Sequence, residues 1–423
     1  MAKMTPQVKQ RIEQIRHGEV PDGYKKTKVG IVPCEWQEIR FKNMFSRITR
    51  KNKVNNDNVL TISAQYGLIN QRDFFNKDIA SDDKSNYYLL ENGEFAYNKS
   101  YSNGYPYGAL KRLDMYDKGI VSPLYICFAA NEENKCPDFY IHYFEAGKMN
   151  REIQAFAQEG ARNHGLLNIS VDDFFNSNIV APSLPEQEKI AEILSAQDKL
   201  IGLKVKLIEE KKRQKKALMQ QLLTGKKRLP GFSGKWVDVK LGDVFAERVE
   251  INCQELELLS VTGTNGVVPR STIETKDNSS EDKSKYLKIC KGDIGYNTMR
   301  MWQGVSALSE YEGIVSPAYT ILIPSPEISA KYFSYLFKMH AVIFLFYRFS
   351  QGIVDDTRSL KYHEFAKLHL NVPKDKKEQE AIAEILTVAD QEIVILQKEL
   401  EQEKQKKKAL MQLLLTGIVR VTE

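Results

Sequence analysis

The most regular pattern of apolar and polar positions lies in two long stretches of the chain. In residues 378–417, apolar side chains recur at alternating steps of three and four, the spacing of a coiled-coil seam: Leu386, Ala389, Ile393, Leu396 and Leu400. Residues 186–225 keep a seven-residue spacing, with polar or weakening positions between: Leu194, Ile201 and Ile208, with Gln197, Lys204 and Gly202. Each stretch lacks proline and ends at a glycine, Gly225 or Gly417, as helices commonly do. We predict two helices of roughly 60 Å that pack against each other.

These two stretches are copies of one sequence. Residues 186–225 and 378–417 align without a gap, and 23 of the 40 positions are identical. The shared runs are E-Q-E-x-I-A-E-I-L at the start and K-K-A-L-M-Q-x-L-L-T-G at the end. Because coiled-coil composition alone would not keep both runs in register, the chain is an internal duplication.

The segments before the two helices are duplicated more faintly. Residues 59–98 align with residues 258–297 at 12 of 40 positions, and Trp36 and Phe45 correspond to Trp236 and Phe245. Short β-rich runs are separated by Gly, Asn and Asp turns, at residues 59–63, 314–316 and 321–323. Amphipathic helices are expected near residues 137–158 and 327–347. We predict a mixed α/β globule before each long helix.

The start of the chain also fits the repeat. Residues 11–15 followed by Gly18 weakly resemble residues 218–222 followed by Gly225. The two ends of the chain therefore fall inside the repeat unit. We expect a closed, two-fold arrangement in which an N-terminal helix packs near the C-terminal one.

Composition and charge narrow the class of protein. A length of 423 residues predicts two to four domains, and 42% hydrophobic residues indicate an ordinary globular balance. The net charge of +6 allows local basic surfaces without marking a histone-like protein. No run of 18 apolar residues or signal peptide is present, so no membrane span is expected. Five cysteines without a C-x-x-C pair indicate a reduced, cytoplasmic protein with neither disulfides nor zinc.

The sequence offers little for catalysis. It contains no G-x-x-x-x-G-K-[ST], H-E-x-x-H or G-x-S-x-G motif, and its six histidines lack metal-ligand spacing. Residues 122–125 and 316–319 resemble the S-P-P-Y motif of amino-methyltransferases but lack its second proline, so a strand start repeated by duplication is favoured. The nuclease-like tripeptide at residues 274–276 has no convincing acidic partner on an upstream strand.

The loops of the two globules favour binding instead. They carry Arg, Lys, Asn and Gln, which can read base edges, and Tyr and Trp, which can stack or wedge. The sequences of these loops differ between the two copies, whereas the framework residues beside them are identical. This difference indicates that the two globules recognise different targets. Ordinary surface loops are an equally open reading of the composition. The candidate DNA-binding residues are Gln65, Tyr66, Gln71, Arg72, Lys99, Tyr101, Asn103, Arg162, Asn163, Thr264, Asn265, Arg270, Arg300, Trp302, Gln303 and Arg358.

Three features together resemble the specificity subunit of type I restriction–modification enzymes. They are the two helical repeats quoted above, the W-x-x-x-x-[LF]-x-x-x-F pattern from Trp36 to Phe45 and from Trp236 to Phe245, and residues 292–300. The resemblance implies an α/β fold with long helices: two target-recognition domains joined by an antiparallel coiled coil. It also implies a non-catalytic subunit that reads a bipartite, asymmetric site on double-stranded DNA.

The resemblance further implies domain boundaries and partners. Residues 1–23 form an N-terminal helix, 24–185 and 226–377 the two target-recognition domains, and 186–225 and 378–423 the two coiled-coil helices. Two modification subunits would methylate adenine with S-adenosylmethionine. Two restriction subunits, where present, would use ATP and Mg²⁺. The chain itself would hold no cofactor or metal.

Two further expectations concern the long helices. Apolar residues at their ends are expected to help dock the modification subunits: Leu218, Met219, Leu222, Leu223, Leu410, Met411 and Leu414. The basic residues of the helices could contact DNA phosphate or a partner, but pairing with Glu209, Glu210, Glu401 and Glu403 is favoured. These basic residues are Lys211, Lys212, Arg213, Lys215, Lys216, Lys404, Lys406, Lys407 and Lys408. The alternative functions are a coiled-coil scaffold with two peptide-binding domains and an enzyme with an unrecognised site.

Overall fold

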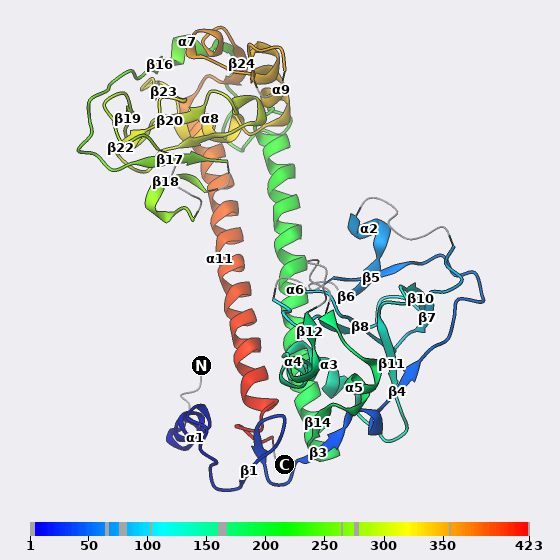
Figure 1. The fold of residues 1–423 in the computed structure, drawn as a ribbon. Helices are drawn as coiled ribbons and strands as arrows, with labels where there is room; N and C mark the ends of the chain where they lie inside the picture. The colour runs from blue at the N-terminus through cyan, green and yellow to red at the C-terminus, as the bar shows by residue number, and fades with distance from the viewer. Residues whose placement is uncertain are drawn as a thin grey trace. The chain divides into compact units, whose positions relative to one another are not determined.

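The chain divides into two compact units in the computed structural model (Figure 1). Unit 1 comprises Met1–Leu203 with Leu400–Glu423, and unit 2 comprises Lys204–Glu399. The division passes through both long helices, so each unit holds part of each helix. The structure describes residues 5–63, 67–75, 83–101, 104–159, 167–263, 265–274, 279–354 and 357–421.

Unit 1 is built on a four-stranded antiparallel sheet in the order β4-β11-β8-β9. Its strands are β4 (Phe45–Ile48), β8 (Phe95–Asn98), β9 (Ala109–Arg112) and β11 (Ile126–Ala130). Four two-stranded pairs accompany it: β1 (Tyr24–Lys26) with β2 (Ile31–Pro33), β3 (Gln37–Arg40) with β14 (Asn178–Ala181), β5 (Leu60–Ser63) with β6 (Gly67–Asn70), and β7 (Tyr88–Glu91) with β10 (Lys118–Val121). A short hairpin joins β12 (Gln158–Glu159) to β13 (Leu167–Asn168).

Unit 2 repeats this topology with a sheet in the order β16-β23-β20-β21. Its strands are β16 (Phe245–Glu247), β20 (Ile294–Asn297), β21 (Ser306–Leu308) and β23 (Tyr319–Pro324). The matching pairs are β15 (Trp236–Lys240) with β24 (His369–Pro373), β17 (Leu259–Thr262) with β18 (Gly266–Pro269), and β19 (Leu287–Ile289) with β22 (Gly313–Val315). Even the isolated parallel bridge Val59–Ile120 recurs, as Leu258–Ile314. The fold confirms the predicted duplication of two mixed α/β globules.

The short helices pack on these sheets. Unit 1 has α2 (Gln71–Phe75), α3 (Pro137–Glu145), α4 (Asn150–Phe156), α5 (Val171–Asn176) and a 3-10 turn, η1 (Phe41–Asn43). Unit 2 has α7 (Leu241–Val244), α8 (Ala330–Leu336), α9 (His340–Phe349), α10 (Tyr362–Phe365) and two 3-10 turns, η2 (Arg270–Thr272) and η3 (Met301–Gln303). Interlocking aromatic rings fill both cores. Phe45 contacts Phe128 edge-to-face at 5.3 Å, and its counterpart Phe245 contacts Phe333 at 5.2 Å.

The prediction of one continuous helix near 137–158 and another near 327–347 was wrong, because each region forms two. The first ends where Gly147 adopts a left-handed φ of +66°, which glycine accepts without strain. The second breaks at Met339, whose ψ of 134° is extended rather than helical. Apolar periodicity continued through both breaks and concealed them.

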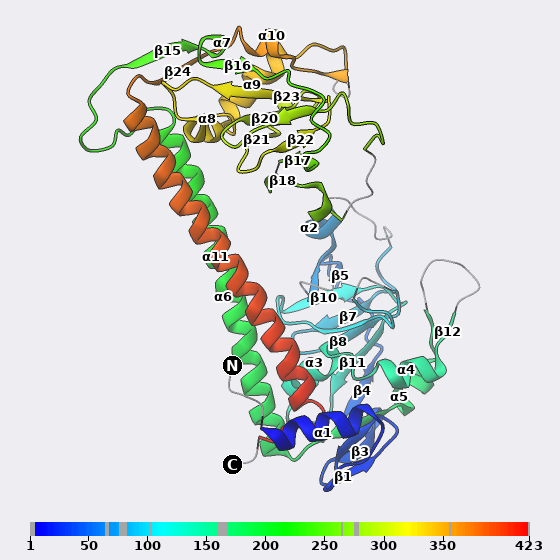
Figure 2. The same ribbon diagram turned by 90° about the vertical axis from the view of Figure 1, so that its left-hand side faces the viewer.

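The two long helices are α6 (Leu184–Leu222) and α11 (Lys376–Leu414), each 39 residues long. They run antiparallel beside each other within each unit (Figures 1 and 2). In unit 2, the Nζ atoms of Lys204, Lys211 and Lys215 reach Glu399, Glu392 and Asp390 in descending order. The predicted seam residues Leu194, Ile208, Leu386 and Ile393 are buried, and Ile201, Ala389, Leu396 and Leu400 are half-buried. Gly225 and Gly417 take the left-handed conformation expected after a helix, with φ near +69° and +68°.

The N-terminal helix α1 (Pro6–Arg16) contacts the end of the chain within unit 1. Arg11 donates a hydrogen bond to the carbonyl oxygen of Ile418 and lies 5.1 Å from the Tyr24 ring centroid. The Tyr24 hydroxyl donates to the carbonyl oxygen of Gly417 at 2.5 Å. The expected proximity of N-terminal helix and C-terminus is therefore observed, although no residue of α1 is fully buried.

Candidate nucleic-acid interface

Both units present a loop after the Tyr-Asn pair that ends a central strand. These are the β8–β9 loop, residues 99–108, and the β20–β21 loop, residues 298–305. The side chains of Asn98 and Asn297 start them alike, each accepting a backbone N–H from the residue two positions on, at 3.1 and 2.9 Å. The two loops therefore leave the same frame in the same direction and then diverge in sequence.

A second segment runs beside each of these loops. The backbone N–H of Leu167 donates to the carbonyl oxygen of Lys99 at 3.0 Å, which joins the β12–β13 hairpin to the β8–β9 loop. In unit 2, the N–H of Leu360 donates to the carbonyl oxygen of Thr298 at 2.9 Å. The structure therefore brings together loop segments that are about 60 residues apart in the sequence.

In unit 2, two candidate residues, Trp302 and Arg358, meet at one aromatic ring. Trp302 lies edge-on to Tyr347 with 6.1 Å between ring centroids. The guanidinium of Arg358 stacks 4.1 Å from the same centroid, and Arg358 Nη2 donates to the Tyr347 hydroxyl at 3.0 Å. Arg300 and Gln303 are exposed on the β20–β21 loop. A stacked arginine beside exposed polar side chains suits contact with phosphates and bases.

Sequence reasoning missed Tyr347 and its neighbour Phe344, which is 54% exposed. Both belong to the most apolar run of the chain, residues 341–347. The signal that could have found them is helical phase, because Val342 and Phe346 are buried while Phe344 and Tyr347 lie on the opposite side of α9.

In unit 1, Lys99 is half-buried and Tyr101 is 62% exposed on the β8–β9 loop. Burial lowers the pKa of Lys99. Six predicted residues lie outside the described part of the chain: Gln65, Tyr66, Asn103, Arg162, Asn163 and Thr264.

The remaining candidates follow the small hairpins β5–β6 and β17–β18. The backbone N–H of Gln71 donates to Val59 at 2.8 Å, and that of Arg270 donates to Leu258 at 2.9 Å. Arg72 is exposed on α2, and Asn265 is exposed in the turn of the second hairpin. The two hairpins thus end at equivalent places, with different side chains at each.

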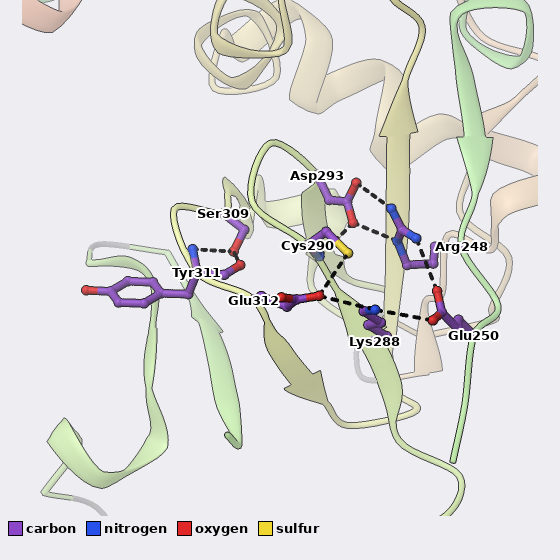
Figure 3. A network of polar contacts seen from close by, with 8 residues as sticks. All are labelled: Arg248, Glu250, Lys288, Cys290, Asp293, Ser309, Tyr311 and Glu312. Atoms are coloured by element: carbon purple, nitrogen blue, oxygen red, sulfur yellow. Dashed lines mark hydrogen bonds and ion pairs between the residues drawn. The ribbon is translucent and has the colours of Figure 1, made fainter. Parts of the chain in front are cut away.

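A charged network holds the turn before the central strand of unit 2 (Figure 3). Asp293 is buried, accepts two hydrogen bonds from Arg248 at 2.8 and 3.2 Å, and accepts the backbone N–H of Cys290. In unit 1, Glu94 at the equivalent position accepts from Arg50 at 2.7 Å and from the N–H of Glu91. These groups shape the frame that carries the loops.

A second pair of networks joins each globule to the helix pair. In unit 1, the ring of His142 on α3 lies 3.1 Å from Ser195 Oγ and 3.7 Å from Asp198, which pairs with Lys407 at 2.6 Å. In unit 2, Tyr335 on α8 donates to Asp390 at 2.9 Å and lies 3.2 Å from Thr387, and Lys215 pairs with Asp390. Burial lowers the pKa of His142, as does Lys407, whereas Asp198 opposes the shift.

Some of the basic helix residues pair across the two helices, and others pair within one helix. Lys211, Lys215 and Lys407 contact Glu392, Asp390 and Asp198 of the opposite helix. Within single helices, Arg213 contacts Glu210, and Lys406 contacts Glu403, as the sequence favoured. Some of these ion pairs therefore join the two helices, which the pattern of charges along a single helix could not predict.

The predicted docking residues lie at the domain ends of the helices. Leu222 and Leu223 are buried in the core of unit 2, and Met411 and Leu414 in the core of unit 1. Their side chains pack inside the chain's own units. Leu218, Met219 and Leu410 are half-buried against the same cores, and docking through them stays a prediction.

The two methyltransferase-like fragments of the sequence have a structural role. Residues 122–125 and 316–319 form matching turns before β11 and β23, closed by N–H bonds of Tyr125 to Ser122 and of Tyr319 to Ser316. Residues 275 and 276 lie outside the described part. Among the described residues, no group of three His, Cys, Asp or Glu could hold a metal ion, and no helix is long and apolar enough to cross a membrane. The five cysteines, all described, are free thiols.

The chain thus holds two copies of one domain, whose loops differ in their polar and aromatic residues. Residues 233–405 match the family described as "Type I restriction modification DNA specificity domain". The type I restriction enzyme MjaVIII specificity subunit of Methanocaldococcus jannaschii is 26% identical over 334 residues, covering 72% of this chain and 75% of that protein. A subunit provisionally described as the MjaX specificity subunit of the same organism is 24% identical, covering 95% and 97%.

The fold agrees with this likeness. The S subunit of a type I restriction–modification system from M. genitalium superposes with a TM-score of 0.52 at 15% identity, covering 90% of this chain and 96% of that one. Residues 233–405 thus match the specificity-domain family, and the chain as a whole is similar to the specificity subunits of type I restriction enzymes.

Proposed function

We propose that this chain reads a bipartite, asymmetric site on double-stranded DNA, with one half read by each unit. The observation that carries the proposal is the pairing of identical frames with different loops. Lys99 and Thr298 accept equivalent backbone hydrogen bonds, yet the residues that follow them differ completely. Equivalent frames would present each loop to a groove in the same way, while different side chains would select different bases.

The decisive experiment maps methylated adenines by single-molecule sequencing in a host that carries this chain with its modification subunit. We expect one split, non-palindromic motif. Exchanging residues 24–185 for the same segment of a relative should change one half of the motif and leave the other unchanged. A change of both halves together would contradict the two-reader proposal.

Purified complex gives a second test, which also separates DNA reading from the peptide-binding scaffold. Binding to the mapped duplex should weaken steeply with salt, because phosphate contacts release counterions. Binding that is insensitive to salt, or absent, would favour the scaffold.

The partners in this proposal are two modification subunits, joined in some complexes by two restriction subunits. S-adenosylmethionine would be held by the modification subunits, and ATP and Mg²⁺ by the restriction subunits, in the cytoplasm of the host. Exposed apolar side chains on α11 support docking on the helices, with Val388 at 54%, Val394 at 61% and Ile395 at 58% exposure. Contiguous exposed apolar groups commonly mark interaction sites.

Co-purification tests this docking surface. A Val388→Asp, Ile395→Asp double variant should lose most of the bound modification subunit, since it places two charges in the expected apolar contact. The matched control is Gln391→Asp, a charge added at an exposed position of the same helix. Equal recovery of the complex from both variants would remove this surface from the proposal.

A further inference from the structure

One lysine of unit 2 lies directly under the β20–β21 loop. Lys338 follows α8, and its Nζ donates to the carbonyl oxygens of Gly304 at 2.7 Å and of Ser306 at 2.6 Å. Gly304 ends the turn η3 with a left-handed φ of +80°. The two hydrogen bonds therefore fix the end of the loop that carries Arg300, Trp302 and Gln303.

Other contacts hold the rest of the loop: Thr298 bonds to Ala318 and Leu360, and the Trp302 ring lies against Tyr347. Met301 is fully buried beneath the turn, and Trp302 Nε1 donates only within the loop, to the carbonyl oxygen of Met299 at 3.0 Å. The outward residues Arg300 and Gln303 are exposed. The buried Met301 and the ammonium group of Lys338 therefore both contribute to the position of these outward residues.

At the equivalent position in unit 1, an acidic side chain, Glu145, contacts the corresponding loop. The run Phe144-Glu145 matches Phe337-Lys338, and both phenylalanines are buried. Glu145 accepts a hydrogen bond from the hydroxyl of Tyr105, in the β8–β9 loop, at 2.5 Å. It also pairs with Lys111 in β9, the strand that follows the loop, and Lys111 Nζ lies 3.1 Å from the same hydroxyl. Two unlike side chains at equivalent positions, at or just after the end of a short helix, thus contact the equivalent loop in each unit.

We propose that Lys338 and Glu145 are positioning residues for DNA recognition, each fixing the loop with which its own unit reads half of the site. Neither side chain needs to touch DNA. This assignment rests on the proposed function, because it takes the two loops to be the segments that read bases. A loop fixed before binding loses less conformational entropy on the DNA and discriminates more sharply.

The chemistry of Lys338 gives a distinctive signature. Burial first, and then the positive charge of Lys215, lower its pKa to about 8. Lys338 lines a groove of about 990 Å³, in which Lys215 faces it from α6, Asp390 from α11, Tyr335 from α8 and His340 from α9. Between pH 7 and pH 9, the protonated fraction of a group with this pKa falls about tenfold. Since the charged group makes the stronger hydrogen bonds, the loop should loosen over this range.

The test uses the full chain with its modification subunit and duplexes of the mapped motif, each carrying one substituted base pair in one half. Lys338→Met should reduce discrimination about tenfold in the half read by unit 2, and Glu145→Met should do so in the half read by unit 1. The control is Lys291→Met, which removes the same charge from a 72% exposed site of unit 2. The control should lower affinity at most and leave discrimination in both halves unchanged.

A pH series separates positioning from general structural damage. The unchanged chain should lose discrimination in the unit 2 half between pH 7 and pH 9, whereas Lys338→Met should be low and flat. A flat profile for the unchanged chain, or equal loss in both halves for Lys338→Met, would overturn the assignment. If the unchanged chain had no split motif at all, the proposed function would fail first and the assignment with it.

Discussion

Equivalent positions in the two copies often make the same kind of contact through different side chains. His142 in unit 1 and Tyr335 in unit 2 both lie on a short helix and both reach a hydroxyl and an aspartate of the first half of a long helix. The aspartates, Asp198 and Asp390, each pair with a lysine of the other long helix at 2.6 Å. Because only histidine titrates near neutral pH, the two units should respond differently to acid.

Lowering the pH should weaken unit 1 selectively. The folded chain lowers the pKa of His142 below its ordinary value of 6.5, so the unfolded chain binds the extra proton more readily. This contribution to stability is fully present above pH 6.5 and is lost as pH falls through the folded pKa. Hydrogen exchange at pH 7.5 and pH 5.5 should show faster opening of α3 at the lower pH. His142→Gln should reduce that difference, and an unchanged difference would assign the effect to other groups.

Buried arginine–glutamate pairs recur at the domain ends of the helices. Arg420 Nε and Nη2 donate to Glu186 at 2.6 and 2.9 Å, and the Trp36 indole donates to the same carboxylate at 2.9 Å. Arg228 holds Glu378 in unit 2 in the same way, at 2.7 and 2.8 Å. The segment after α11 thus provides unit 1 with an arginine for its buried glutamate, as the segment after α6 does for unit 2.

Arg420→Met should therefore destabilise unit 1 by about 3 kcal/mol, because it leaves the 4% exposed Glu186 carboxylate without its charged partner. Hydrogen exchange in denaturant, read separately for each unit, is the measurement. Arg213→Met is the control, since its partner Glu210 is exposed and the pair should contribute less than about 1 kcal/mol. A loss as small as the control's would show that Glu186 is satisfied by Trp36 and water.

At the scale of the helices, polar residues interrupt the seam at defined places. Gln197 is buried at a seam position and donates to the Glu403 carboxylate at 2.7 Å and to the Glu403 carbonyl oxygen at 3.2 Å. Lys204 donates to Glu399 at 2.7 Å. Such polar seam positions often fix the register of a helix pair at some cost in stability.

Gln197→Leu should raise the stability of the helix pair by about 1 kcal/mol, because an apolar group replaces a buried amide. Glu403 keeps Lys406 at 3.5 Å, so its carboxylate is not left alone. Thermal unfolding of the pure chain measures the change, with exposed Gln214→Leu on the same helix as control. A lower stability would mean that the bond from Gln197 outweighs apolar packing.

Helices and strands were predicted correctly where one periodic pattern was clear. The prediction failed where tertiary contacts set the ends of a helix. The long helices were predictable because residues 186–222 and 376–414 contain no proline and repeat apolar positions every seven residues. The strand runs at 59–63 and 321–323 are confirmed as β5 and β23. The breaks at Gly147 and Met339 could not be placed, since an apolar run does not show where a helix must turn to stay on a sheet.

At the scale of the whole molecule, the duplicated helices are expected to set the gap between the two halves of the DNA site. Seven residues inserted after Lys199 keep the seam in phase and add about 10 Å of helix, or roughly three base pairs of rise. Because the partner helix is not lengthened, we expect a gap longer by one to three base pairs with both half-sites unchanged. Methylome sequencing of the variant is the readout.

A four-residue insertion at the same place is the control, because it misphases the seam and should abolish activity. An active seven-residue variant that still methylates the original spacing would defeat this expectation. The helices would then serve as a docking surface only.

The sequence by itself determined the duplication, the two α/β globules and the pair of long helices, and its resemblance to a known family implied the antiparallel arrangement and the class of protein. Those conclusions rest on local periodicity and on motifs kept in register, which need no coordinates. Only the tertiary structure decided which candidate residues meet, such as Trp302 and Arg358 at Tyr347, and which apolar ends are core rather than surface, such as Leu222 and Leu414. It also revealed Lys338 and Glu145 beneath their loops. Those contacts join residues 11 to 45 positions apart through side-chain packing, which no sequence period records.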